Sequence, residues 1–313
     1  MINILSGISV GLAVILVLSV ILVYWLFQLA FKRQDKLPKL FCDPNNPQNG
    51  IVYDWAWLNS HVLEERKIIS SHDEILLNGH FLRSQSNSHR YFITFHGFKG
   101  NFRELSAMCH FVYDEFDMNI LMVDERAHNG SGGKYITMGY LEKYDALDWI
   151  KHICKKDPDA QICLYGISMG ASIIMAASGL PEFPQNVRCI IEDSGFSSIY
   201  KEYQHICRCD FAINTSFVLP AFEKLAKKII GIDFHHESPV EMISRSKTPT
   251  LFIHGDKDTF VPFKMLDENF RALPDSVPKE KYVTHGVAHC LSYFIYPDEY
   301  KNRVVNFIRK YAY

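Results

Sequence analysis

The chain opens with a long apolar stretch that contains no charged residue. From Met1 to Phe31 there is no Asp, Glu, Lys, Arg or His, and the 22 residues from Ile8 to Leu29 would form a helix of about 33 Å. A secretory signal usually has a basic start, a shorter apolar run and a small-residue cleavage site, whereas this run starts uncharged and ends in bulky Tyr24-Trp25-Leu26-Phe27. The pattern therefore predicts a retained transmembrane anchor over residues 4–31.

The flanks of this span predict its orientation. Tyr24 and Trp25 lie near its C-terminal end, where amphipathic rings favour the membrane interface. The same end is followed by four cations, and no cation precedes the span: Lys32, Arg33, Lys36 and Lys39. The positive-inside rule then predicts a single-pass membrane protein whose body faces the cytoplasm, although some N-terminal anchors export the domain that they carry.

Beyond the span, hydrophobic runs of two kinds alternate. Residues 32–50 are rich in Pro and Asn and predict a linker, so the folded domain is expected over 51–313. Short apolar runs predict buried strands at 91–95, 120–123, 162–165, 189–191 and 250–253. Between them, helical patterns occupy 102–116, 141–156 and 172–179. This alternation predicts an α/β fold, with a mostly parallel central sheet and helices on both faces.

One segment breaks the alternation. Residues from about 197 to 247 contain no strong strand pattern but do contain helical fragments such as 222–230. We expect an inserted helical cap over one end of the sheet. The shape of the substrate pocket depends on how this cap folds, and the pattern does not predict that.

Composition narrows the possible partners. The 313 residues carry 33 Lys and Arg against 35 Asp and Glu, a net charge of −2, so a nucleic-acid partner is not expected. The eight cysteines form no dense framework, which favours free thiols. No nucleotide-binding glycine motif is present, and His235-His236-Glu237 lack a second ligand pair at helical spacing. Neither a cofactor nor a metal is therefore expected.

The clearest chemical motif is Gly166-Ile167-Ser168-Met169-Gly170. It follows an apolar strand and precedes a helix of small residues. A sharp strand-to-helix turn of this kind lifts a serine hydroxyl out of the sheet, and it requires small residues two positions to either side. We therefore predict Ser168 to be a nucleophile, which would need a histidine to take its proton and a carboxylate to orient that histidine.

From about residue 75 to the C-terminus, the chain resembles the α/β-hydrolase superfamily, in particular its membrane-anchored serine-aminopeptidase-like and acyl-ester hydrolase branch. The segment His96-Gly97-Phe98 matches the family's H-G motif, which implies an oxyanion hole made by the backbone N–H groups of Phe98 and Met169. The loop from His254 to Pro262 matches H-G-x-x-D-x-x-V-P and implies Asp258 as the acid. His289 then completes the family order of nucleophile, acid and histidine.

Two of these assignments have close competitors in the sequence. His285 lies four residues before His289, but it falls at the end of the strand expected over 282–284, whereas His289 lies in the loop beyond. Asp256 precedes Asp258 by two residues, and Asp193 follows an earlier strand, where some members of the fold carry their acid. The loop motif favours Asp258.

A further stretch, from Asp124 to Ser131, resembles the family's D-x-R-x-H-G-x-S segment. Here Asn129 replaces the usual glycine, and Asn is the next-best residue for a left-handed turn. We expect a structural role for this stretch, in which Asp124 and Arg126 pair with each other or with Asp145, and no chemical role for His128.

The resemblance implies a cofactor-free serine hydrolase that cleaves a carboxylic ester of an acyl or lipid-like substrate through an acyl-serine. One alternative is an aminopeptidase-like amide hydrolase, which would need an anion for the substrate's amine; Glu202, Glu223 and Glu237 are candidates. Another is a catalytically silent, membrane-tethered binding module. Because the expected site lies wholly beyond residue 31, we expect deletion of residues 1–31 to release an active body.

Overall fold

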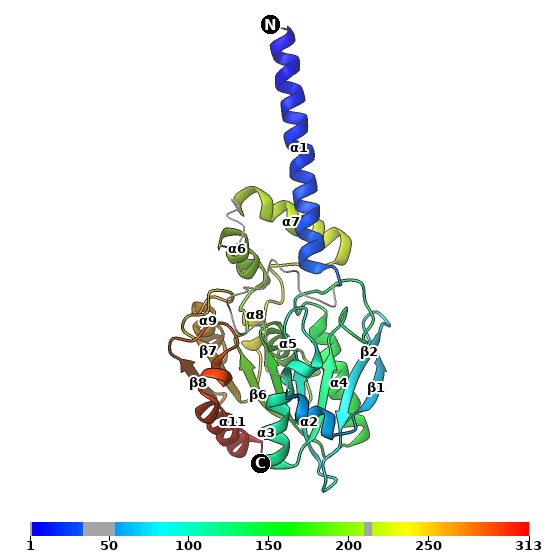
Figure 1. Ribbon diagram of the computed structural model, residues 1–313, viewed down its shortest axis with the longest axis vertical. Coiled ribbons are helices and arrows are strands. Elements are labelled where there is room, and N and C mark those ends of the chain that lie inside the picture. The colour runs from blue at the N-terminus through cyan, green and yellow to red at the C-terminus, as the bar shows by residue number, and fades with distance from the viewer. Residues whose placement is uncertain (1, 34–53, 210–214, 313) are drawn as a thin grey trace.

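The computed structural model describes residues 2–33, 54–209 and 215–312, so most of the predicted linker lies outside the described residues. Helix α1 (Ile2–Phe31) projects as a rod from one end of an α/β body (Figure 1). Residues Ala13–Phe31 have a mean hydropathy of 2.5, and α1 is the one described helix long and apolar enough to cross a membrane. The C-terminus lies at the opposite end of the body.

An eight-stranded sheet forms the centre of the body, in the order β1-β2-β4-β3-β5-β6-β7-β8. Strand β2 is antiparallel to β1 and β4, and all other pairs are parallel. The sheet is thus mostly parallel, as the alternating pattern predicted. The strands are β1 (Glu64–Ile69), β2 (Leu76–Leu82), β3 (Arg90–Phe95), β4 (Asn119–Asp124), β5 (Gln161–Ile167), β6 (Val187–Asp193), β7 (Thr250–Gly255) and β8 (Lys279–Thr284).

The strand order reverses at β3, which lies between β4 and β5. The chain runs outward from β3 to β4 and then crosses back to β5, β6, β7 and β8. In open parallel sheets, ligands bind at such a switch point, outside the carboxyl ends of the strands. The loops after β3 and β5 carry the residues predicted for the oxyanion hole and the nucleophile.

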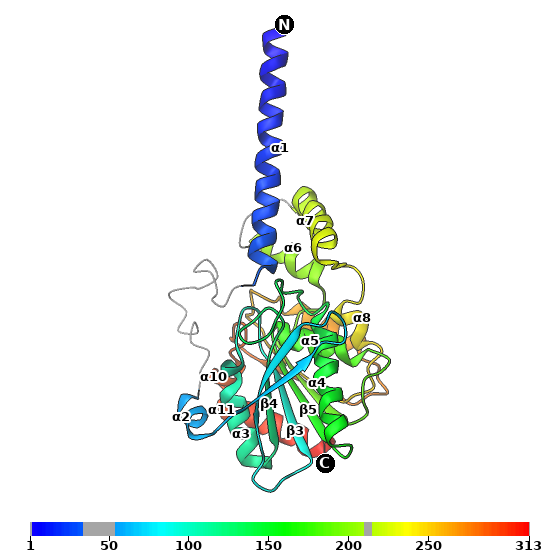
Figure 2. The same ribbon diagram turned by 90° about the vertical axis from the view of Figure 1, so that its right-hand side faces the viewer.

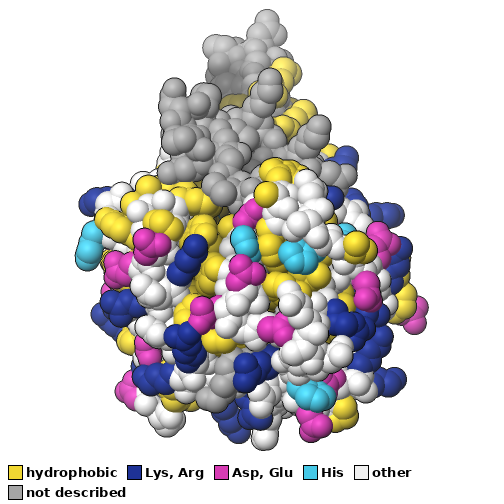
Figure 3. All heavy atoms as spheres, turned by 60° about the horizontal axis from the view of Figure 1, so that its bottom comes forward, with side chains coloured by type: hydrophobic (Ala, Val, Ile, Leu, Met, Phe, Trp, Pro, Cys, Tyr) yellow, Lys and Arg dark blue, Asp and Glu magenta, His cyan; other side chains and the backbone are white. Residues whose placement is uncertain are grey.

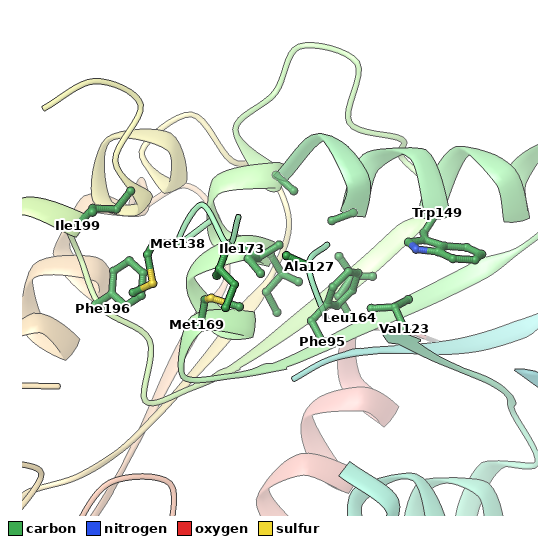
Figure 4. Packing of buried hydrophobic residues seen from close by; sticks show 14 of the residues in the cluster. Phe95, Val123, Ala127, Met138, Trp149, Leu164, Met169, Ile173, Phe196 and Ile199 are labelled. Carbon is green, nitrogen blue, oxygen red and sulfur yellow. The ribbon is translucent and has the colours of Figure 1, made fainter. Parts of the chain in front are cut away.

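Helices cover both faces of the sheet (Figures 1 and 2). On one face α4 and α5 pack on the sheet, and Trp149 of α4 and Ile173 of α5 belong to the same buried cluster as Phe95 and Leu164 (Figure 4). On the other face lie α2, α3 and α11. The helices of the body are α2 (Trp55–Ser60), α3 (Ser106–Phe116), α4 (Glu142–Lys156), α5 (Met169–Ser178), α6 (Ile199–Cys209), α7 (Thr215–Ile230), α8 (Pro239–Ile243), α9 (Lys264–Ala272), α10 (Ser292–Ile295) and α11 (Pro297–Tyr311).

The predicted cap segment divides into two parts. Helices α6 and α7 stand over the end of the sheet, beside the lower end of α1, whereas α8 packs directly on α5 (Figures 1 and 2). That packing is close: a Cβ on Gly179 at the end of α5 would lie 2.1 Å from the carbonyl oxygen of Met242. The part of the segment that covers the sheet end is therefore the α6–α7 pair.

The last turns of α1 are part of the body's core. Side chains from Val10 to Trp25 are mostly exposed, but Phe27 and Phe31 are fully buried. The Phe31 ring centroid lies 5.3 Å from that of Phe222 in α7 and 5.5 Å from that of Tyr203 in α6. The same helix thus supplies an apolar segment, Ile2 to Trp25, of about 36 Å, in which the described side chains from Val10 onward are mostly exposed, and then a docked end.

Candidate active site

Ser168 occupies the sharp turn between β5 and α5. Its backbone has a φ of 54° and a ψ of −118°, a strained conformation for a residue with a side chain. The turn also requires both flanking glycines, because a Cβ on Gly166 would lie 2.4 Å from the Gly170 carbonyl oxygen and one on Gly170 would lie 2.0 Å from that of Phe95. The glycine spacing therefore has the steric origin that the sequence indicated.

Ser168, His289 and Asp258 lie in one hydrogen-bonded row. The Nε2 atom of His289 is 2.9 Å from the Ser168 Oγ, and its Nδ1 atom is 2.6 Å from the Asp258 Oδ2. The other carboxylate oxygen of Asp258 accepts the backbone N–H groups of Phe260 and Val261, each at 2.9 Å. With Nδ1–H donating to Asp258, the Nε2 atom of a neutral His289 has a lone pair that can accept a hydrogen bond from the Ser168 hydroxyl.

The charges of this row reinforce one another. Burial by itself would raise the pKa of Asp258, but the nearby His289 charge and hydrogen bonds from His254 and His289 lower it below its ordinary value. For His289, burial would lower the pKa, but the Asp258 charge and hydrogen bond raise it above 6.5, aided by the charges of Glu202 and Asp193. The carboxylate is ionised and the imidazole is a stronger base than usual.

A second histidine, given no role by the sequence, also contacts the acid. The Nε2 atom of buried His254 lies 3.0 Å from the Asp258 Oδ2 and 3.0 Å from the Val261 carbonyl oxygen. His254 is the penultimate residue of β7 and the first residue of the motif that identified Asp258, so the motif itself was the available signal. Two imidazoles and two backbone N–H groups thus fix the orientation of this carboxylate.

The predicted oxyanion loop is shaped by two buried histidines. His96 donates from Nδ1 to the Gly97 carbonyl oxygen at 2.8 Å and accepts the Glu125 N–H at Nε2. His128 accepts the Lys99 N–H at 3.0 Å. Burial lowers the pKa of His96 and lowers that of His128 to about 3, so both rings are neutral. As expected, His128 has structural contacts; the N–H groups of Phe98 and Met169 remain the predicted oxyanion donors.

The stretch around Arg126 supports this loop. Arg126 forms hydrogen bonds to Asp145 at 2.6 and 2.7 Å, which confirms one of the two expected pairings. Of the two alternatives, the pair with Asp145 is the one that forms; Asp124 accepts hydrogen bonds from Asn78 and His80 on the adjacent antiparallel strand β2, a strand that the sequence pattern did not predict. Asn129 has a φ of 41°, the left-handed conformation expected where the family has glycine.

The competing residues lie apart from this row. His285 and Asp256 contact each other, with Nδ1 and Oδ2 3.0 Å apart, and the His285 side chain is 83% exposed. Asp193 is buried behind the serine, where its carboxylate accepts the Tyr300 hydroxyl at 2.8 Å and its carbonyl oxygen accepts the Ser168 N–H at 2.7 Å. Asp193 therefore stabilises the turn at Ser168 through its backbone carbonyl group.

An apolar cleft leads from the Ser168 hydroxyl toward α1 and the cap. Its volume is about 690 Å³, counting the open mouth. Its walls come from three places: the end of α1, the cap helices, and the loops that carry Phe98 and Phe260. Sequence reasoning missed the contribution of α1, because both a lipid-facing and a core-facing helix end are apolar.

Of the three acidic residues considered for amine binding, Glu202 lines this cleft. Glu223 instead forms an ion pair with His235 at 2.9 Å, and Glu237 forms one with Lys143. The His235-His236-Glu237 run thus has local partners on the cap and body surface. No group of three or more potential metal ligands occurs among the described residues.

The strand order, the turn at Ser168 and the position of His289 after the last strand define the α/β-hydrolase fold. No family model matches the chain. It is 26% identical over 192 residues to the uncharacterized protein YqkD of Bacillus subtilis (strain 168), a match that covers 61% of this chain and 62% of YqkD. The chain therefore aligns with less than two thirds of that relative's length.

Solved structures share the fold at low sequence identity. The esterase Pf2001 of Pyrococcus furiosus superposes with a TM-score of 0.65 at 23% identity, over 81% of this chain and 94% of the esterase. The acylaminoacyl peptidase of Pyrococcus horikoshii gives a TM-score of 0.57 at 18% identity, over 79% of this chain and 41% of the peptidase. The predicted α/β-hydrolase fold is thus confirmed.

Proposed function

We propose that this protein is a serine hydrolase that cleaves a carboxylic ester through an acyl-serine intermediate. The observation that carries the proposal is the hydrogen-bonded row from the Ser168 Oγ through His289 to Asp258, placed on a strained turn. An esterase among the solved structures of the same fold supports an ester as the substrate.

The first half of the proposed reaction forms the acyl-enzyme. As the Ser168 Oγ attacks the ester carbonyl carbon, its proton moves to the Nε2 atom of His289, and Asp258 stabilises the imidazolium. The carbonyl oxygen becomes an oxyanion that accepts hydrogen bonds from the N–H groups of Phe98 and Met169; each such donor contributes about 3 to 4 kcal/mol. Met169 begins α5, so its N–H has no acceptor within the helix. The intermediate then collapses, and His289 gives its proton to the leaving alcohol.

The second half releases the acid. A water molecule takes the position of the alcohol, His289 removes its proton, and the resulting hydroxide attacks the acyl carbon. Collapse returns the proton to the Ser168 Oγ and leaves a carboxylic acid. The proposed steps use only these side chains, backbone N–H groups and water. We further propose that α1 anchors the protein in the membrane and that the body lies in the cytoplasm, as Lys32 and Arg33 at the end of α1 favour.

The test is labelling with a fluorophosphonate probe, followed by turnover of p-nitrophenyl esters. We expect wild-type protein to be labelled and Ser168→Ala to lose both labelling and about 10⁶-fold in kcat. Undiminished labelling of Ser168→Ala would assign the nucleophile elsewhere. A wild-type protein that neither labels nor turns over any ester would support the silent binding module instead.

A second candidate is hydrolysis of an aminoacyl amide, which Glu202 favours because a carboxylate in the cleft would pair with a substrate ammonium. The acylaminoacyl peptidase with the same fold is consistent with amide chemistry on this scaffold. Aminoacyl p-nitroanilides distinguish the two: ester turnover without anilide turnover supports the esterase, and efficient anilide turnover supports the amidase. A Glu202→Gln variant should then raise KM for the anilide alone.

A further inference from the structure

The docked end of α1 forms one wall of the active-site cleft. Leu26, Leu29 and Ala30 line it on one side, and Tyr203, Ile206 and Phe222 of the cap line it on another. Ser168 lies in the same cleft, so the anchor helix and the serine share one apolar space. A helix that served only to anchor the protein would not need to line the active-site cleft.

The membrane interface lies one turn of helix from these residues. Tyr24 and Trp25 are exposed rings just before the docked turns, in the position of an aromatic belt, and the segment before them is long enough to cross the hydrocarbon core. Leu29 is four residues beyond Trp25, about 6 Å along the helix axis. In a bilayer spanned by α1, the residues of α1 that line the cleft would therefore lie at the level of the headgroup layer.

The surface charge around α1 agrees with this placement. Helix α7 packs beside α1 (Figure 2) and exposes Lys224 and Lys228, with the apolar Ile229 exposed next to them. A third exposed lysine of α7, Lys227, forms an ion pair with Asp233 at 2.8 Å. Cations with an adjacent apolar side chain are typical of a helix that lies against anionic headgroups. On the opposite end of the body, basic and acidic side chains are interspersed, as on a surface in contact with water (Figure 3).

The end of α1 is also tied to the loop that carries Phe98. Lys99 donates from Nζ to the Leu29 carbonyl oxygen at 2.6 Å, and burial lowers its pKa to about 8. Arg33 donates to the carbonyl oxygens of Asn129 and Ser131, in the loop whose His128 accepts the Lys99 N–H. The position of the end of α1 and the shape of this loop are therefore linked through Lys99 and Arg33.

We infer that the substrate is a long-chain acyl ester of the bilayer, which enters laterally between α1 and the cap helices. The acyl chain slides along Leu29 and Ala30 and stays in apolar surroundings from the bilayer to Ser168, so it never crosses water. The inference rests on the proposed function, since it names the substrate class of that same site. It also predicts that the bilayer holding the protein is the source of its substrate.

The first experiment reconstitutes the full chain in vesicles of phosphatidylcholine with a minor share of phosphatidylglycerol. The probe, methylumbelliferyl palmitate, is placed either in the same vesicles as the protein or in separate ones. We expect turnover to be at least about tenfold faster in the shared bilayer. Equal rates in the two arrangements would overturn lateral entry, and so would turnover of p-nitrophenyl acetate with no turnover of the palmitate, although either result would leave the proposed hydrolase intact.

The second experiment places a bulky side chain on the cleft wall that α1 forms. Ala30→Trp should lower turnover of vesicle-borne palmitate at least about tenfold more than it lowers turnover of p-nitrophenyl acetate, because the short acetate does not extend along this wall. Leu18→Trp, on the exposed part of the same helix, is the matched control and should change neither. If Ala30→Trp displaces α1 from the body, Leu29→Gln provides a smaller change in the same wall. Equal losses for both substrates would overturn the inference, and absence of any ester turnover and labelling in the wild-type protein would instead refute the proposed function.

Discussion

Asp258 accepts the Nδ1–H of His289 at 2.6 Å, while the neighbouring pair of the same residue types, Asp256 and His285, is hydrogen-bonded separately at the surface. The chain thus holds two Asp–His pairs built from the same two loops, one facing Ser168 and one facing solvent. Each member of the outer pair is a natural control for the corresponding member of the inner pair.

The two pairs should respond differently to substitution. Asp258→Asn and His289→Ala should each lower kcat by about 10⁴-fold or more, because the first disturbs the tautomer of the base and the second removes it. Asp256→Asn and His285→Ala should stay within about threefold of wild type, since their side chains contact only the loop surface. Steady-state kinetics with a p-nitrophenyl ester measures all four, and a larger loss in the outer pair would reverse the assignment.

His254 should act as a positioning residue for Asp258. Its Nε2 atom lies 3.0 Å from the carboxylate, so His254→Leu leaves that oxygen with one imidazole donor and should lower kcat about 10- to 100-fold with little change in KM. His254→Gln retains an N–H donor and should recover part of the loss. Thermal unfolding provides the control: a fall in Tm with unchanged kcat in the folded fraction would mean that His254 only stabilises the loop.

The pH profile should report the charges around His289. Only neutral imidazole accepts the serine proton, so kcat/KM falls as pH drops through the pKa of His289, at a midpoint above 6.5 because Asp258 raises that pKa. The Glu202 charge raises it further, and Glu202→Gln should therefore shift the acidic limb to lower pH. Glu223 pairs with His235 instead, so Glu223→Gln should leave the midpoint of the acidic limb unchanged. A limb shifted upward in Glu202→Gln would contradict the sign of this interaction.

The sequence predicted the five parallel strands β3 to β7 because each contains a short apolar run that is largely buried. It missed β1, whose residues Glu64 to Ile69 are charged and largely exposed, and β2, which contains Asn78, Gly79 and His80. β1 is the edge strand and carries charged side chains, whereas in β2 three residues, Asn78 to His80, interrupt the apolar positions, so neither strand has a continuous apolar run. Because β2 was not predicted, two partners of Asp124 on that strand were not predicted either.

For the site itself, the motifs located Ser168, Asp258 and His289 because each type of residue follows a strand at a spacing set by the fold. They did not locate the cleft walls. Glu202, Glu223 and Glu237 are equivalent in sequence, and only the path of α6 and α7 places the first of them in the cleft. Likewise, Leu26 to Phe31 continue the apolar pattern of the anchor, so nothing in their composition separates a lipid-facing turn from one that packs on Tyr203 and Phe222.

The orientation of the anchor can be tested through the cysteines. Cys209, at the end of α6, is exposed, whereas Cys207 is buried in the cleft wall. If the body faces the cytoplasm, a membrane-impermeant maleimide should modify Cys209 only after lysis. The protein used should carry Cys42→Ser, so that no label comes from Cys42, which lies outside the described part of the chain.

The matched control for this orientation test is Asn3→Cys at the other end of α1, made in a background that also carries Cys209→Ser. The span of about 36 Å places the two thiols on opposite sides of the bilayer, so the Asn3→Cys thiol should react in intact cells and Cys209 should not. The reverse pattern would place the body outside, because the two labels exchange when the helix is inverted. Lys32 and Arg33 would then flank the outer face, and the acyl esters that reach the cleft would come from the outer leaflet.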